Sequence, residues 1–212
     1  AGIEKFWNHA RYFTANISSP NTPGLRNLQA EDALRTLLAR VLGKRDELAA
    51  GIGTTRPVFL KIAPDLDAAQ MNEIAGVINK STLDGLIVSN TTIGRAGVEG
   101  SRHAAEAGGL SGKPLFERST IVLARMRQLL GPALPIIGVG GIDGAATAIA
   151  KMEAGANLVQ LYTGMINRGP GIAREIHDGM IHELERRKIG SVTALTSTRT
   201  DEWAMRKLPG ES

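Results

Sequence analysis

One segment, residues 134–164, constrains the fold more than any other part of the chain. Residues 135–139 form a short apolar run, rich in Ile and Val and bounded by glycine, which is typical of a strand covered on both faces of a parallel sheet. Residues 158–162 form a second apolar run. Between the two runs, apolar side chains recur at helical spacing at Ala145, Ile149 and Met152. The segment therefore predicts one βαβ unit.

The turn of this unit, residues 138–141, contains three glycines and is the first candidate for a binding site. A turn without side chains exposes backbone N–H groups at the start of a helix, where a phosphate binds well. Asp143 is expected to cap that helix. The same glycines are also expected in a tight turn that only permits close packing, and the turn alone does not separate the two interpretations.

Three further apolar runs precede the unit and predict strands at residues 14–18, 57–63 and 85–89. Helical patterns separate the strands, which makes the fold class α/β. Five strands fit either an open, doubly wound sheet or a (β/α)8 TIM barrel that lacks its opening strands, because a closed barrel of this kind has eight.

Three stretches lie outside this alternation. An apolar stripe from Ile3 to Phe13 predicts an N-terminal helix. Residues 90–115 keep no periodicity and contain recurrent glycines, so we expect a long loop, and loops of that length in compact domains are usually functional. The chain becomes polar after Lys188, which indicates a tail or an interaction arm near the C-terminus.

Composition excludes several classes of function. The net charge of +4 comes from 25 basic and 21 acidic residues, and no basic cluster alternates with aromatic residues, so we expect no nucleic-acid partner. The absence of cysteine excludes disulfides, thiolate metal sites and a cysteine nucleophile. The four histidines show no metal spacing, and no metal site is predicted. No apolar run approaches membrane-spanning length.

Polar residues and glycines follow the carboxyl ends of the predicted strands, which is the edge where parallel α/β folds bind ligands. They are Asn16, Ser19, Asn21, Lys61, Ser89, Asn90, Thr91, Gly140, Gly141, Tyr162, Thr163 and Gly164. Several amides at one edge suggest a planar, amide-rich substrate held by paired donors and acceptors. Lys61 is the most telling single residue, because a cation between Leu60 and Ile62 needs an anionic partner unless it extends to water.

Six motifs, taken together and in order, resemble one family closely. They are Asn-Ile-Ser-Ser-Pro-Asn-Thr-Pro-Gly-Leu at 16–25, Leu-Lys-Ile-Ala-Pro-Asp at 60–65, Ser-Asn-Thr-Thr at 89–92, Gly-Gly-Leu-Ser-Gly-Lys-Pro-Leu at 108–115, Gly-Val-Gly-Gly-Ile at 138–142 and Gln-Leu-Tyr-Thr-Gly at 160–164. The combination resembles class 2, quinone-dependent dihydroorotate dehydrogenase. The base of that family is serine in class 2 and cysteine in class 1, so Ser19 and the lack of cysteine agree on class 2.

The resemblance implies an FMN enzyme on a (β/α)8 TIM barrel, of which this chain supplies the last five βα units. Residues 1–192 are then the C-terminal portion of the FMN-binding barrel, and residues 193–212 a polar C-terminal tail. The implied reaction oxidises (S)-dihydroorotate to orotate in de novo pyrimidine (UMP) biosynthesis, with quinone as electron acceptor. By motif position, Ser19 removes the C5 proton while hydride passes from C6 to FMN N5, and Thr22 is a relay.

The remaining site residues also follow by motif position. Substrate contacts are expected from Asn16, Asn21, Asn90 and Thr91. Contacts to FMN are expected from Asn16, Lys61, Ser89, Gly112, Gly140, Gly141, Tyr162, Thr163 and Gly164. The resemblance further implies a peripheral protein on the cytoplasmic side of the inner membrane, which it contacts through an N-terminal segment that is absent from this sequence.

Two other hypotheses are compatible with the residues alone. A lysine at a strand end beside a phosphate turn also suits a non-redox barrel lyase that forms a Schiff base through Lys61. The third hypothesis is an inactive, truncated half-barrel.

Overall fold

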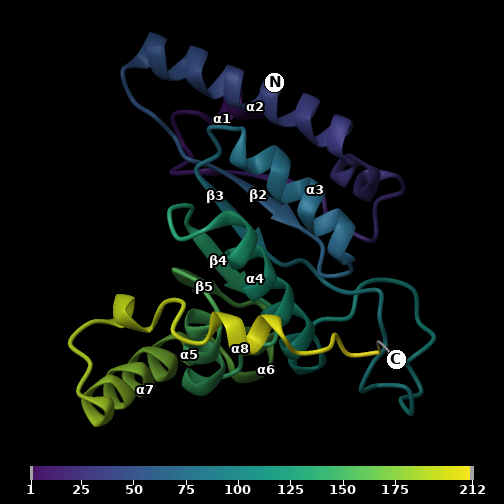
Figure 1. The fold of residues 1–212 in the computed structure, drawn as a ribbon, viewed down its shortest axis with the longest axis vertical. Coiled ribbons are helices and arrows are strands. Elements are labelled where there is room, and N and C mark those ends of the chain that lie inside the picture. The colour runs from purple at the N-terminus through teal and green to yellow at the C-terminus, as the bar shows by residue number, and fades with distance from the viewer. Residues whose placement is uncertain (1, 211–212) are drawn as a thin grey trace.

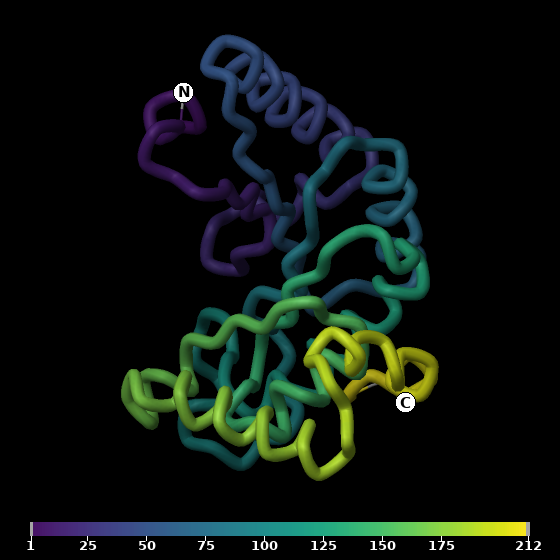
Figure 2. The backbone as a smooth tube through the Cα atoms, turned by 90° about the vertical axis from the view of Figure 1, so that its left-hand side faces the viewer, coloured from purple at the N-terminus to yellow at the C-terminus, as the bar shows by residue number. Residues whose placement is uncertain are grey.

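The computed structural model describes residues 2–210, and its centre is a five-stranded parallel sheet. The strands are β1 (Phe13–Asn16), β2 (Val58–Ile62), β3 (Gly85–Val88), β4 (Ile136–Val139) and β5 (Leu158–Gln160). They lie in the order β1-β2-β3-β4-β5, which is also their order in the sequence. Figure 2 shows the same progression, with the purple and blue N-terminal segments at the top and the yellow-green C-terminal segments below.

This strand order decides between the two predicted architectures. A doubly wound sheet reverses its strand order at a switch point, and no such reversal occurs here. Since β-crossover-β connections between parallel strands are right-handed, a sheet that never reverses receives all of its crossover helices on one face. The sheet therefore has the connectivity of an arc of a β/α barrel.

The helices that connect and flank the strands follow the predicted alternation. They are α1 (Gly2–Phe6), α2 (Glu31–Ile52), α3 (Ala68–Asn79), α4 (Phe116–Leu130), α5 (Ala145–Glu153), α6 (Thr163–Arg168), α7 (Ile172–Arg187) and α8 (Thr200–Ala204), with short 3-10 helices η1 (Leu25–Gln29), η2 (Lys113–Leu115) and η3 (Val192–Leu195). Figure 1 shows α3 and α4 in front of the strands and α8 lying across α4.

The two faces of the sheet differ in burial. On the covered face, which packs against the helices, six side chains have no exposed surface: Val58, Leu60, Ile62, Leu86, Val88 and Ile136. The strand register aligns a row of residues on the opposite, open face: Asn16, Lys61, Ile87, Ile137 and Leu158. Exposure along that row increases from Ile87 at the centre, 3% exposed, to Leu158 at one edge, 59% exposed.

The N-terminal segment differs from the helix predicted over Ile3 to Phe13. Helix α1 ends at Phe6, and Phe13 opens β1 by donating its N–H to the carbonyl of Pro57 (2.8 Å). Trp7, 1% exposed, stacks on Phe13 with ring centroids 6.0 Å apart. Trp7 and Phe13 of the apolar stripe therefore pack together as expected. Phe13 nevertheless lies in a strand and not in a helix, because it pairs with β2.

The N-cap of α5, the helix of the βαβ unit at residues 134–164, also differs from the prediction. Gly144, not Asp143, is the N-cap of α5. The Asp143 carboxylate instead accepts a hydrogen bond from Thr147 Oγ1 (3.1 Å), and that hydroxyl oxygen accepts from the N–H of Asp143 (3.1 Å). Since the helix begins one residue later than expected, Asp143 lies outside it and braces the turn from there.

The segment expected as a polar tail, residues 193–212, is packed against the domain as far as the structure describes it. Leu195, Trp203 and Leu208 are at most 5% exposed. Trp203 meets Phe116 of α4 edge to face, with ring centroids 6.0 Å apart. Arg125 of α4 donates to the carbonyls of Ala204 (3.1 Å) and Arg206 (2.8 Å). The polar composition hides these anchors because they are widely spaced.

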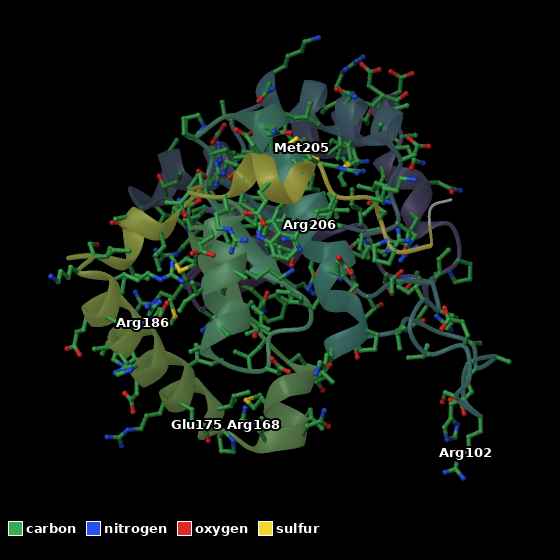
Figure 3. The ribbon with its side chains drawn as sticks, turned by 60° about the horizontal axis from the view of Figure 1, so that its bottom comes forward. Arg102, Arg168, Glu175, Arg186, Met205 and Arg206 are labelled. Atoms are coloured by element: carbon green, nitrogen blue, oxygen red, sulfur yellow. The ribbon has the colours of Figure 1, made fainter. Side chains whose placement is uncertain are left out.

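The long loop predicted over residues 90–115 has an internal framework, although η2 occupies its last residues. Arg95 donates to five backbone carbonyls of the loop, those of Ile93, Gly94, Ala104, Glu106 and Gly108. Arg102 lies at the far tip of the loop and projects away from the rest of the molecule (Figure 3). One guanidinium thus organises a segment without regular secondary structure.

Candidate active site

A cleft lies at the carboxyl ends of β2, β3, β4 and β5, where the sequence predicts a ligand. All of the predicted FMN contacts except Asn16 line this cleft, and so do the predicted substrate contacts Asn90 and Thr91. The full lining is Lys61, Ser89, Asn90, Thr91, Ser111, Gly112, Leu115, Val139, Gly140, Gly141, Ile142, Leu161, Tyr162, Thr163 and Gly164. Residues separated by up to about half of the chain therefore meet at one edge of the sheet.

The glycine turn after β4 approaches the start of α4 very closely. Gly140 and Gly141 have φ values of +113° and +73°, which side-chain-bearing residues rarely adopt. A Cβ atom on Gly141 would lie 2.5 Å from Phe116 Cα and 2.7 Å from Phe116 N. The close-packing interpretation of this turn is therefore correct for Gly141.

The same turn also presents unused donors to the cleft. Within residues 2–210, the N–H groups of Gly140 and Gly141 donate to no other protein group. Buried or half-buried N–H groups normally have a partner, so these two are available to a ligand in the cleft. Close packing and anion binding are thus compatible functions of the same glycines.

The wall of the cleft opposite the glycine turn is formed by α6 and the end of the long loop. Thr163 Oγ1 donates to Ser111 Oγ (2.9 Å), and a Cβ on Gly112 would lie 3.1 Å from Thr163 Cγ2. Arg168, at the last turn of α6, donates to the carbonyl of Asp143 (2.7 Å) and pairs with Glu175 of α7 (2.5 Å), the pair labelled in Figure 3. These contacts hold α6 against the turn that follows β4.

Lys61 supplies the cationic group of the cleft. It lies on the open face of β2, in register with Asn16 of β1 and Ile87 of β3. Partial burial lowers the pKa of Lys61, because desolvation penalises the ammonium form. The Lys61 ammonium makes no hydrogen bond or ion pair within the described part of the chain, so its charge is free to stabilise an anion.

A polar cluster joins the ends of β1 and β3. Ser18, which has no exposed surface, donates its hydroxyl to Asn16 Oδ1 (2.8 Å). Asn90 Nδ2 donates to Ser18 Oγ (3.0 Å) and to Asn16 Oδ1 (3.3 Å). The fold thereby brings together two predicted substrate contacts, Asn16 and Asn90, that lie 74 positions apart in the chain. Asn16 does not line the cleft itself, but it contacts Asn90, which does.

The predicted catalytic residues lie on the loop after β1, next to this cluster but outside the cleft lining. Ser19 is half-buried, and its Oγ accepts the N–H of Asn21 (3.3 Å), whereas Asn21 and Thr22 are exposed. Within residues 2–210, no histidine or carboxylate hydrogen-bonds Ser19 Oγ. Ser19 therefore has no local partner of the kind found in a hydrolase triad.

Gly109 allows the long loop to lie against the loop that follows β1. A Cβ on Gly109 would lie 1.9 Å from Thr91 Oγ1 and 3.0 Å from Pro20 Cγ. Pro20, which follows Ser19, and the predicted substrate contact Thr91 thus share Gly109 as a neighbour. The structure brings the Ser19 loop to the rim of the cleft, at its Thr91 end.

The lining also contains residues that the sequence interpretation did not select, among them Ser111, Leu115, Ile142 and Leu161. Ser111 and Leu115 fall within the motif at 108–115, so that motif could have identified them. Ile142 and Leu161 fall within the motifs at 138–142 and 160–164, so those motifs could have identified them too, although their apolar character alone does not separate lining from core.

Comparison with known proteins agrees with this geometry. The family described as dihydroorotate dehydrogenase matches residues 1–184. The dihydroorotate dehydrogenases (quinone) of Brucella ovis and Brucella abortus are each 57% identical over 208 residues, which is 98% of this chain and 57% of theirs. The chain therefore spans little more than half the length of these curated relatives.

Solved structures show the same likeness. The dihydroorotate dehydrogenase of Eimeria tenella in complex with ferulenol superposes with a TM-score of 0.88 at 36% identity, over 93% of this chain and 56% of that one. The ligand-free form from Eimeria tenella gives a TM-score of 0.87 at 37% identity, over 93% and 58%. On the family match, the close relatives and the shared fold, this chain belongs to the dihydroorotate dehydrogenase family.

Proposed function

We propose that this chain carries the FMN site and part of the substrate site of a quinone-dependent dihydroorotate dehydrogenase, which oxidises (S)-dihydroorotate to orotate in pyrimidine biosynthesis. The observation that carries the proposal is the cleft at the strand ends, whose lining includes all but one of the residues that the family motifs assign to FMN. The class follows from the relatives, which are named for a quinone acceptor.

The cleft suits FMN at two separate points. The free N–H groups of Gly140 and Gly141, with the hydroxyl pair of Thr163 and Ser111, which keeps one proton to donate, would hold the phosphate. Lys61 would lie at the edge of the isoalloxazine ring where negative charge develops, and its lack of a protein partner leaves it free for that role. FMN, when bound, supplies the acceptor for the hydride of the substrate.

The amide groups of the cleft would hold the substrate. Asn16 and Asn90, already joined through Ser18, offer both donors and acceptors to the ring of a dihydropyrimidine. Asn21 and Thr91 flank them at the rim, where they would hold the carboxylate or the ring. Paired amides of this kind select a planar, polar ligand rather than an apolar one.

Ser19 would remove the proton from C5 of the substrate, with Thr22 as a relay. A serine hydroxyl is a weak base, so the reaction requires a site from which bulk water is excluded. The exposed positions of Asn21 and Thr22 imply that the part of the loop beyond Ser19 closes further when substrate is present.

We further infer that electrons leave the flavin to a membrane quinone and that the whole protein is peripheral to the inner membrane, on its cytoplasmic side. The relatives' printed name supports the quinone. In the described part of the chain, no helix combines the length and the apolar character needed to cross a bilayer.

The decisive experiment uses the full-length protein that contains this chain. Ser19→Ala should retain bound flavin but slow anaerobic flavin reduction by dihydroorotate about 10²- to 10⁴-fold, the usual cost of removing a general base. Ser101→Ala, in the exposed part of the long loop, is the matched control and should reduce at the wild-type rate. Unchanged single-turnover reduction in Ser19→Ala would refute the role of Ser19.

One observation favours a second candidate function. A lysine with a lowered pKa and no partner is also typical of Schiff-base enzymes, so Lys61 suits a non-redox lyase. Flavin absorbance in the purified full-length protein would support oxidoreduction. Colourless protein in which borohydride traps a carbonyl substrate on Lys61 would support the lyase, and colourless protein with neither activity would support an inactive half-barrel.

A further inference from the structure

An ion pair outside the cleft links the loops that follow β1, β2 and β3. Arg26 of η1 pairs with Asp65, which follows β2, at 3.0 Å between Nη1 and Oδ2. The two side chains are 23% and 13% exposed, so the pair is largely shielded from water. Neither residue lines the cleft, and the proposed mechanism uses neither.

The other nitrogens of Arg26 reach the two loops that carry the proposed chemistry. Nε donates to the carbonyl of Ser18 (3.1 Å), the residue before the proposed base. Nη2 donates to the carbonyl of Thr91 (3.1 Å), a proposed substrate contact. One planar guanidinium therefore fixes the backbone beside Ser19 relative to the backbone of Thr91.

Asp65 extends the same connection along the loop after β3. Its Oδ1 accepts the hydroxyl of Thr92, and its Oδ2 accepts the N–H of Ile93 (3.0 Å). The 3-10 helix that carries Arg26 is itself attached to the end of β2, because Gln29 Oε1 accepts the N–H of Ala63 (2.9 Å). The connection thus spans three consecutive strand ends, through residues that are buried or half-buried except at exposed Ile93.

We propose that Arg26 and Asp65 are positioning residues that hold the Ser19 loop at a fixed distance from the Asn90–Thr91 end of the cleft. The inference rests on the proposed function, because it concerns the geometry of the base relative to the substrate contacts. The fork of Arg26 spans Ser18, Thr91 and Asp65 at once, which the single ammonium of a lysine does not do. Misplacement of a reacting group by about 1 Å costs on the order of 100-fold in rate.

The test compares two conservative variants in the full-length protein. Arg26→Lys keeps the charge but loses the planar guanidinium. Asp65→Asn keeps the shape but weakens the three hydrogen bonds that the carboxylate accepts, from Arg26, Thr92 and Ile93. Each should slow anaerobic flavin reduction by dihydroorotate about 10- to 100-fold. Each should leave the FMN dissociation constant within about twofold of wild type, since the connection touches none of the glycine turn.

Hydrogen exchange supplies a readout that does not depend on turnover. In both variants, exchange should accelerate in residues 17–24 and 90–93 and stay unchanged in β3 and α4, because only the loops lose their link. Arg35→Lys is the matched control. Arg35 makes ion pairs with Glu31 and Asp32 on the exposed side of α2, and in the described part of the chain its side chain hydrogen-bonds to no residue of the three loops. It should change neither rate nor exchange.

The outcomes separate this inference from the proposed function. Wild-type protein that binds flavin but is not reduced by dihydroorotate would overturn the function. An active wild type, a slow Ser19→Ala variant and wild-type behaviour in both Arg26→Lys and Asp65→Asn would overturn only the positioning role. Loss of FMN and of global protection in both variants, with an unchanged reduction rate per bound flavin, would also overturn it, because the pair would then be purely structural.

Discussion

Leu60 and Lys61 are neighbours on β2, yet they lie on opposite faces of the sheet. Leu60 has no exposed surface and packs among the helices, as do the other members of the covered face. Lys61 belongs to the row of the open face, where exposure increases towards both edges of the sheet. Alternation along each strand therefore separates a face that stabilises the fold from a face that ends in the cleft.

The two faces of the sheet should therefore tolerate amino-acid substitutions differently. Close-packed interiors are sensitive to the loss of a single methylene, because neighbouring groups relax only partly. The open face retains exposed apolar groups at its edge, including Leu158 on β5. Substitutions on the covered face should thus affect stability, whereas those on the open face should affect binding and association.

The largest expected difference is between two leucines of the same sheet. Leu86→Ala, on the covered face of β3, should lower the free energy of unfolding by about 2 to 5 kcal/mol, because it leaves a cavity among buried groups. Leu158→Ala, at a position 59% exposed on the open face, should change it by less than about 0.5 kcal/mol. Urea unfolding followed by circular dichroism measures both values, and equal losses would contradict the division between the faces.

A second comparison uses two glycines with similar backbone angles. Gly141, φ +73°, abuts Phe116, whereas Gly169, φ +79°, has no atom within 4 Å of the position of an added Cβ. Alanine at either site incurs backbone strain. Gly141→Ala should lose about 1 to 3 kcal/mol more than Gly169→Ala, because the added methyl is also overpacked. In the full-length protein, flavin titration should show weaker FMN binding for Gly141→Ala alone.

Lys151 of α5, a cation on the covered side with no exposed surface, makes a smaller effect testable. Its Nζ donates to Ser119 Oγ (2.6 Å), and the ammonium lies 5.3 Å from the centre of the Phe116 ring. Complete burial lowers the pKa of Lys151 well below its ordinary value of 10.5. Between the lowered pKa and 10.5, the unfolded chain binds more protons than the folded one, so stability rises with pH.

Lys151→Met should remove this contribution to the pH dependence. At pH 7 the variant should differ from wild type by no more than about 1 kcal/mol, since loss of the hydrogen bond to Ser119 is offset by removal of a buried cation. Between pH 7 and pH 10 the wild type should gain stability relative to the variant. Unfolding curves that stay parallel across this range would show that Lys151 does not titrate differently in the folded state.

Substitutions on β5, the strand at one edge of the sheet, should have the smallest effect on stability but a clear effect on self-association. Strand β5 carries exposed Leu158, and Tyr162 and Ile166 follow it at 71% and 65% exposure. Unpaired edges and apolar patches favour pairing with another chain, so we expect the 212-residue chain to self-associate. Leu158→Lys should reduce the sedimentation coefficient at high concentration while changing stability by less than about 0.5 kcal/mol.

Ile52→Lys is the control for that experiment. Ile52 is 50% exposed at the end of α2, away from the open face, and its replacement should leave association unchanged. A monodisperse wild-type monomer that unfolds cooperatively would contradict the expectation for the edge.

Much of the fold could be predicted because its strands are short buried runs with clear ends. The runs at residues 57–63 and 135–139 became β2 (Val58–Ile62) and β4 (Ile136–Val139), each bounded by proline or glycine. The helix predicted from the stripe before β1 is present over Gly2–Phe6 but does not continue to Phe13. The spacing of the stripe suits a helix, but Phe13 is drawn into the sheet by pairing with Val58, a contact across the chain that periodicity does not contain.

The candidate site likewise contains features that the sequence predicted and features that only the structure shows. Motifs at strand ends predicted Lys61, Asn90 and Gly141 as members of one edge, and the cleft unites them. The pairing of Arg26 with Asp65 carried no signal, because two ordinary charged residues 39 positions apart reveal nothing until three loops converge. The packing of the C-terminal segment could not be predicted for a related reason, since its buried residues Leu195, Trp203 and Leu208 are too widely spaced to form a local pattern.

The sequence by itself determined the α/β alternation, the parallel strands and the residue types at their carboxyl ends, because hydrophobic period and glycine positions act over a few residues. Only the tertiary structure decided the strand order, the open and covered faces, and the contact of Asn16 with Asn90 across 74 positions. Those depend on the hand of each crossover and on which strands pair, and both are settled by packing of the whole chain rather than by any local segment.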